Sequence, residues 1–80
     1  MPKRPNNAYR AQWARKALDV FATEAWGIGN PSTLDPADVE AALTDLIADL
    51  LHLATREGFD ASAVLDTGRL HFNAELEGEE

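Results

Sequence analysis

The sequence predicts an all-α protein, a small three-helix bundle that ends in an antiparallel helical hairpin. A long run of apolar residues at helical spacing follows Asp35-Pro36, and Gly58 closes this run directly before a second start signal at Phe59-Asp60. Because the connection is so short, the last two helices must be antiparallel neighbours. Eighty residues form one domain, which buries about 60–65% of the surface that its unfolded chain would expose.

The chain divides into a flexible basic tail (residues 1–6), a single helical domain (7–76) and a frayed acidic end (77–80). Two prolines favour an extended tail. We find no internal repeat and no low-complexity segment that would subdivide the domain. The three predicted helices therefore share one hydrophobic core.

The first helix is predicted to run from Ala8 to about Trp26. Asn7 is a suitable N-cap, and Gly27 ends the helix. Glu24 falls within the apolar side, and we expect its long side chain to reach water past the last turn. The other residues on that side are apolar: Trp13, Ala14, Ala17, Leu18, Val20, Phe21 and Ala25.

The second helix begins at Pro36, because Asp35 is a suitable N-cap and proline in the first helical position loses no hydrogen bond. Arg56 complements the negative end of the helix dipole, and Gly58 can adopt the left-handed conformation that closes the helix. Its apolar stripe is wide enough to contact two neighbours, so we expect this helix to be central. The stripe consists of Val39, Ala42, Leu43, Leu46, Ile47, Leu50, Leu51, Leu53 and Ala54.

The third helix starts after Asp60 as N-cap, and Phe59 and Val64 have the spacing of a hydrophobic staple. Gly68 lies in the middle of this helix, where glycine costs about 1 kcal/mol relative to alanine. We therefore expect it to permit the close approach of another helix. The apolar face consists of Val64, Leu65, Phe72 and Leu76.

The charges are sorted along the chain. Residues 1–16 carry five basic side chains and no acid, whereas the remainder carries fourteen acids and two arginines, for a net charge of −7. An acidic body repels phosphate, so it disfavours direct nucleic-acid binding and favours a protein partner with a basic surface. The alternative that remains open is a small nucleic-acid accessory protein that uses the basic arm, with Lys3 and Arg4 as its contacts.

The composition favours a cytoplasmic protein that binds no membrane. Cysteine is absent, which suits a reducing compartment, and neither a signal-peptide core nor eighteen consecutive apolar residues occur. A domain this small also gains stability by pairing, so a homodimer is a further expectation that the sequence leaves open.

The candidate binding residues lie mainly on the polar side of the second helix: Asp38, Asp45, Asp49, His52 and Arg56. Spacings of four and three residues place Asp45, Asp49 and His52 side by side, where they can meet one divalent cation or form an ordinary solvated face. Trp26 and Tyr9 are further candidates, because aromatic side chains are enriched at binding hot spots; burial is the alternative for both.

The run Asp45-Leu46-Ile47-Ala48-Asp49-Leu50-Leu51-His52-Leu53-Ala54, followed by Gly58-Phe59-Asp60, resembles the second half of MazG-like all-α nucleotide pyrophosphatases. Those enzymes hold Mg²⁺ with carboxylates from a Glu-Glu-x-x-Glu helix and a Glu-x-x-Asp helix. The resemblance covers about a third of the chain and implies a Mg²⁺-dependent pyrophosphatase remnant with Asp45, Asp49 and Glu24 as metal ligands. This chain departs from both motifs. Its first helix offers only Asp19 and Glu24, and its second helix has Asp45 and Asp49 in place of Glu-x-x-Asp.

The same run is similar to short uncharacterised helical proteins of bacteria and mobile elements, a resemblance that implies no activity. The matching residues are Asp45, Leu46, Asp49, Leu50, His52, Ala54, Gly58, Asp60 and His71. With no convergent catalytic groups, the sequence favours a non-catalytic, cofactor-free protein-binding module. A sharper hypothesis is a phage or mobile-element inhibitor of a nucleic-acid-binding effector, such as an anti-CRISPR protein.

Overall fold

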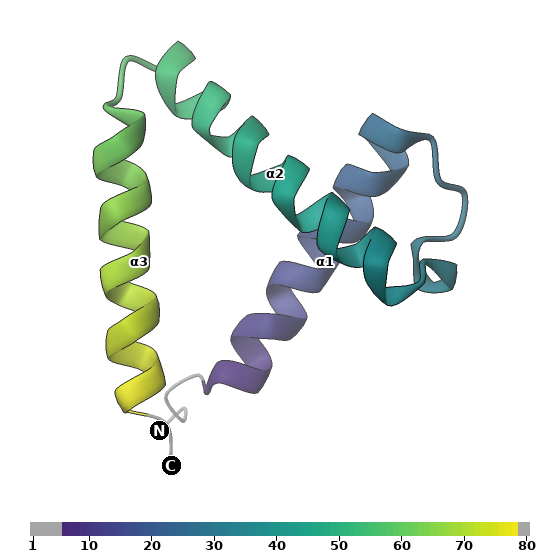
Figure 1. The fold of residues 1–80 in the computed structure, drawn as a ribbon, viewed down its shortest axis with the longest axis horizontal. Coiled ribbons are helices and arrows are strands. Elements are labelled where there is room, and N and C mark those ends of the chain that lie inside the picture. The colour runs from purple at the N-terminus through teal and green to yellow at the C-terminus, as the bar shows by residue number, and fades with distance from the viewer. Residues whose placement is uncertain (1–5, 79–80) are drawn as a thin grey trace, which may run out of the picture.

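The computed structural model describes residues 6–78 and arranges them as three α-helices with short connections (Figure 1). The helices are α1 (Asn7–Trp26), α2 (Pro36–Arg56) and α3 (Ala61–Glu77), and a 3-10 turn, η1 (Pro31–Thr33), lies between α1 and α2. No strand occurs within the described range. The prediction of a small all-α bundle with a C-terminal helical hairpin is confirmed.

Each α-helix begins at an asparagine or aspartate whose side chain accepts a backbone hydrogen bond. Asp35 accepts from Asp38 N at 2.9 Å and Asp60 accepts from Ala63 N at 3.0 Å, as their positions in the sequence predict. The N-cap of α1 is Asn6 instead of Asn7: the Asn6 side chain accepts from Tyr9 N at 3.0 Å. Adjacent asparagines offer the same cap chemistry, so the sequence alone does not choose between them.

Glycine ends both α1 and α2. Gly27 and Gly58 are the glycines with positive φ in the described chain, at 70° and 83°. After α2, Gly58 N–H donates to Thr55 O at 3.1 Å and Phe59 N–H donates to Ala54 O at 2.9 Å, which is the Schellman pattern. These bonds satisfy carbonyls at the end of α2 and direct the chain straight into α3.

The three helices lie along the sides of a triangle (Figure 1). The α1 helix crosses α2, and α2 and α3 diverge from the turn that joins them, so that the far end of α3 returns to the start of α1. There Arg10 Nε lies 3.2 Å from Glu75 Oε2, and Asn7 Nδ2 donates to Glu75 O at 3.1 Å. The radius of gyration of 14.4 Å exceeds the value of about 11.6 Å for a compact domain of this length.

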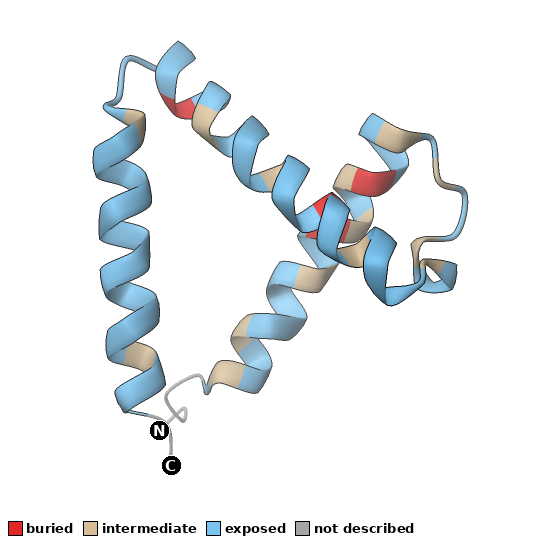
Figure 2. Cartoon of the chain, in the orientation of Figure 1, coloured by how far each residue is buried: buried red, intermediate tan, exposed pale blue. Residues whose placement is uncertain are grey.

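The hydrophobic core is small. Leu18 and Ala22 of α1 and Ala42 of α2 are buried, and Ala54 is buried near the turn into α3 (Figure 2). Alanine at such positions lets helix axes approach closely. The wide apolar stripe of α2 is covered only in part, since Leu46 is half-buried while other large side chains of the stripe remain exposed: Leu43, Ile47, Leu50 and Leu53.

The expected apolar side of α1 is rotated relative to the side that is buried. Leu18 is 1% exposed, but Trp13 and Val20 are 55% and 65% exposed. The α1 helix packs mainly against α2 and η1 and meets α3 only through the polar contacts of Asn7 and Arg10 with Glu75, so one narrow strip of its apolar surface is covered. Glu24 is exposed, as expected for a side chain that reaches water from the last turn.

Most of the two predicted tails lies outside the described residues. Of the expected basic tail (1–6), residues 1–5 lie outside the described residues, and the same holds for residues 79–80 of the expected acidic end (77–80). Glu77 is the last residue of α3, and Gly78 is its C-cap. Among the described helices, none is both long enough and apolar enough to cross a membrane.

The buried Leu18 provides a test of the core. Replacing Leu18 by alanine removes the largest fully buried side chain and should lower the free energy of unfolding by about 3 kcal/mol. Val20→Ala, two residues away and largely exposed, should change it by less than about 0.5 kcal/mol. Urea denaturation followed by circular dichroism measures both; equal losses would contradict the assigned core.

The turn at Gly58 gives a second test. A Cβ at Gly58 meets no atom within 4 Å, so Gly58→Ala tests the φ of 83° alone and should destabilise the protein by about 1 kcal/mol. Gly29 also has free space around its Cα, but its φ is not positive, so Gly29→Ala should be neutral or slightly stabilising. Thermal denaturation at one protein concentration compares the two; a neutral Gly58→Ala would rule out the left-handed turn.

Candidate functional site

The polar side of α2 carries a row of charged side chains that we call the acidic face: Asp38, Asp45, Asp49, His52 and Arg56. All five are exposed. At a rise of about 1.5 Å per residue, the row extends for roughly 27 Å along the helix. It lies opposite the apolar stripe, so binding through the acidic face does not require the helix to leave its place in the fold.

Trp26 connects the end of α1 to this face. Its side chain is half-buried, and Nε1 donates a hydrogen bond to Asp45 Oδ2 at 3.1 Å. This contact orients one carboxylate of the row. The sequence left burial or exposure open for Trp26; the structure places it between the two, half-buried and hydrogen-bonded to Asp45 of the acidic face.

The other members of the acidic face are held by their helix alone. Within residues 6–78, the side chains of Asp38, Asp49, His52 and Arg56 make no hydrogen bond and no ion pair. Asp49, His52 and Arg56 follow one another at spacings of three and four residues, so they form a continuous strip on the helix surface. These groups retain their full capacity to bind an external partner.

Tyr9 does not belong to the same surface. It is 54% exposed and lies near the start of α1, whereas Trp26 ends that helix. Seventeen residues of helix separate them by about 25 Å. The two aromatic candidates therefore cannot contact one small ligand together, although each is accessible.

The described residues contain no group of three or more His, Cys, Asp or Glu side chains placed to hold a metal ion. Asp45 and Asp49 share one side of α2, and Asp45 already accepts the Trp26 hydrogen bond. Glu24 lies on α1, where it lines a shallow depression of about 270 Å³ together with Asp19, Val20, Thr23 and Pro31. The pyrophosphatase resemblance implies that Asp45, Asp49 and Glu24 bind Mg²⁺. Their carboxylates do not form such a group in the described structure, so this set of ligands stays a prediction.

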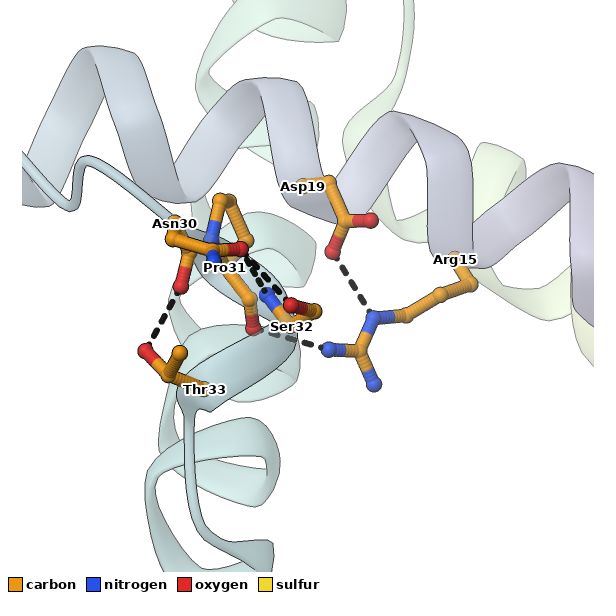
Figure 3. A network of polar contacts seen from close by, with 6 residues as sticks. All are labelled: Arg15, Asp19, Asn30, Pro31, Ser32 and Thr33. Atoms are coloured by element: carbon orange, nitrogen blue, oxygen red, sulfur yellow. Dashed lines mark hydrogen bonds and ion pairs between the residues drawn. The ribbon is translucent and has the colours of Figure 1, made fainter.

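A polar network beside this depression fixes the connection between α1 and α2 (Figure 3). Arg15 donates from Nε to Asp19 Oδ1 at 2.8 Å and from Nη2 to Pro31 O at 3.0 Å. Asn30 Oδ1 accepts from Ser32 N at 3.2 Å and from Ser32 Oγ at 2.7 Å, which starts the 3-10 turn. The sequence analysis did not predict this network. The signal that could have indicated it is Asn30 followed by proline and serine, a combination typical of the start of a short helix or turn.

Comparisons with known proteins give no family assignment. The chain matches no protein-family model, and neither the curated proteins nor the solved structures show a significant similarity to it. The function must therefore be argued from the side chains themselves.

The Trp26–Asp45 contact provides a third test. Asp45→Ala removes the acceptor of the indole hydrogen bond and should lower the free energy of unfolding by about 1 kcal/mol. Asp49→Ala removes the same charge one turn away, where no side-chain partner is lost, and should be close to neutral. Tryptophan fluorescence and urea denaturation report both effects. Equal stability of the two variants would mean that the contact contributes nothing.

Proposed function

We propose that this protein is a non-catalytic binding module whose acidic face contacts a basic surface of another protein. The observation that carries the proposal is the row of exposed charges on α2, most of which lack a side-chain partner within the described chain. Asp49 has no basic residue four positions away on either side, and His52 and Arg56 are both basic, so the strip from Asp49 to Arg56 has no i,i+4 ion pair of its own.

The physical basis of such binding is electrostatic complementarity on a rigid support. The α2 helix spans 21 residues and is capped at its start, so little backbone order is lost when a partner binds. Two carboxylates one turn apart can accept hydrogen bonds from arginine, whose planar fork suits bidentate contacts. The net charge of −7 accelerates association with a basic partner and makes binding sensitive to salt.

A sharper form of the proposal names the class of target. Proteins that bind nucleic acid present arginine and lysine to phosphate, and a row of carboxylates offers the same groups an alternative anionic ligand. A small acidic helix that occupies such a site would act as an inhibitor, as an anti-CRISPR protein encoded by a phage or mobile element does. The dense acidity of the chain after residue 16 supports this target class.

The test is a charge reversal with an equal control. Asp38→Lys with Asp49→Lys changes two exposed acids of the acidic face, and Asp66→Lys with Glu77→Lys makes the same charge change on α3. Tagged protein is incubated with a lysate of the producing cells at low and high salt. A partner that binds through the acidic face should be retained by the parent chain and the α3 variant at low salt, and lost by the α2 variant and at high salt.

Calorimetry with the purified partner then gives the magnitude. Each reversal places a lysine against a basic surface, and we expect the affinity to fall at least tenfold for the α2 variant. Circular dichroism first establishes that both variants keep their helix content. Equal binding by the α2 and α3 variants, or retention that does not respond to salt, would rule out the acidic face as the contact.

A further inference from the structure

The apolar surface that the fold leaves uncovered is large for a chain of this size. Among the described residues, thirteen large apolar side chains are 38–66% exposed, whereas Leu18 is the largest side chain that is fully buried. An 80-residue chain with so small a core has little hydrophobic stabilisation to offset its conformational entropy. The uncovered surface therefore matters for the stability of the chain itself.

On α3 two of the uncovered apolar side chains, Leu65 and Phe72, lie on the face that is turned into the triangle. Ala61 at the start of the helix is half-buried, and Glu75 near its end contacts α1. Residues between these two contacts at spacings of four and three share their face. Leu65 and Phe72 occupy that face and are 38% and 59% exposed.

On α2 the uncovered side chains lie between its two contact regions. Ala42 is buried where α1 crosses and Ala54 is buried near α3. Leu43, Ile47 and Leu50 occupy the intervening stretch and are 43%, 49% and 52% exposed. They lie on the side opposite the acidic face.

The spacing of these residues suits another helix as the covering element. On α2, Val39, Leu43, Leu46, Leu50 and Leu53 follow one another at intervals of four, three, four and three residues. On α3, Ala61, Leu65, Gly68, Phe72 and Glu75 repeat the same intervals, with Leu65 and Phe72 as the large apolar members. This is the repeat with which helices pack side chains of one into gaps of the other.

Gly68 supports the same conclusion. It lies at the centre of the α3 row, and a Cβ added to it meets no atom within 4 Å. The expectation that Gly68 permits close approach of another helix is thus not met by any described element of the same chain. A glycine that costs about 1 kcal/mol in a helix interior is explained if a helix from outside approaches there.

We propose that a second copy of this chain covers the inner faces of α2 and α3, pairing hairpin with hairpin about a two-fold axis. The five exposed large side chains of the two rows, Leu43, Leu50, Leu53, Leu65 and Phe72, present roughly 500 Å², taking about 200 Å² for a fully exposed large apolar side chain. Stable interfaces bury about 800 Å² per partner, of which about 65% is apolar in homodimers, so the rows supply about the apolar area that a stable pair needs.

A second copy of the chain is the partner best suited to bury this apolar surface permanently. Burial of the uncovered apolar surface would stabilise the folded chain itself. The partner that buries it must therefore be present whenever the chain is present, and a second copy of the chain meets that condition. In a two-fold pair the same patch of each copy is buried, and the matching spacing lets the α2 row of one copy pack against the α3 row of the other. The acidic faces point away from the rows, which limits repulsion between the two acidic chains.

The experiment measures the molar mass by light scattering and the melting temperature over a range of protein concentrations. The parent chain should have about twice the 8.7 kDa chain mass, and its melting temperature should rise by about 4 °C per tenfold increase in concentration. Phe72→Asp places a charge in the α3 row and should halve the mass or unfold the protein. Leu70→Asp, at a side chain that is 66% exposed on the opposite side of α3, should leave the dimer intact.

A single-chain mass with a melting temperature independent of concentration would overturn the proposal, as would equal dissociation in Leu70→Asp and Phe72→Asp. A monomer that is purified with a different protein on these faces would also overturn it. The Asp38→Lys, Asp49→Lys variant keeps the apolar rows, so it should remain dimeric. Loss of partner binding with the dimer retained therefore tests the acidic face separately from this interface.

Discussion

The α1–α2 crossing is the contact on which the rest of the fold depends. Leu18 and Ala22 on α1 and Ala42 on α2 are three of the four buried residues of the described chain. Small residues let the two helix axes come close, but they also bury little area each. The geometry therefore gives a defined crossing without a large core, and it leaves the arrangement of α3 to weaker contacts.

Those weaker contacts are the turn at Gly58 and the polar contacts of Glu75. The Schellman bonds fix how the chain leaves α2, and a partly exposed ion pair such as Arg10–Glu75 adds at most about 1 kcal/mol. Neither contact buries apolar surface along the length of α3. This is why the hairpin is open, with its helices in contact near the turn and apart beyond it (Figure 1).

The two sides of α2 have different physical roles. Its polar side carries the acidic face, which has charges to offer but little area for burial, and its apolar side carries uncovered leucine and isoleucine. Electrostatic contacts set association rate and specificity, whereas apolar burial supplies most of the free energy of a permanent interface. The proposed basic partner on the polar side and the proposed second copy on the apolar side would each use the interaction that its side of α2 provides.

The sequence determined the local structure of this protein. Aspartate before proline, glycine after the apolar run and the helical spacing of leucines encode where helices begin, end and show their apolar sides, because these signals act within a few residues. The residues that form the acidic face can also be predicted from the sequence, because their spacing along the helix places them on one side. Its Trp26 contact and the Arg15–Pro31 bond were not, since each joins residues at least sixteen positions apart. Only the tertiary structure decided which apolar residues are covered, because that depends on the angles at which the helices meet.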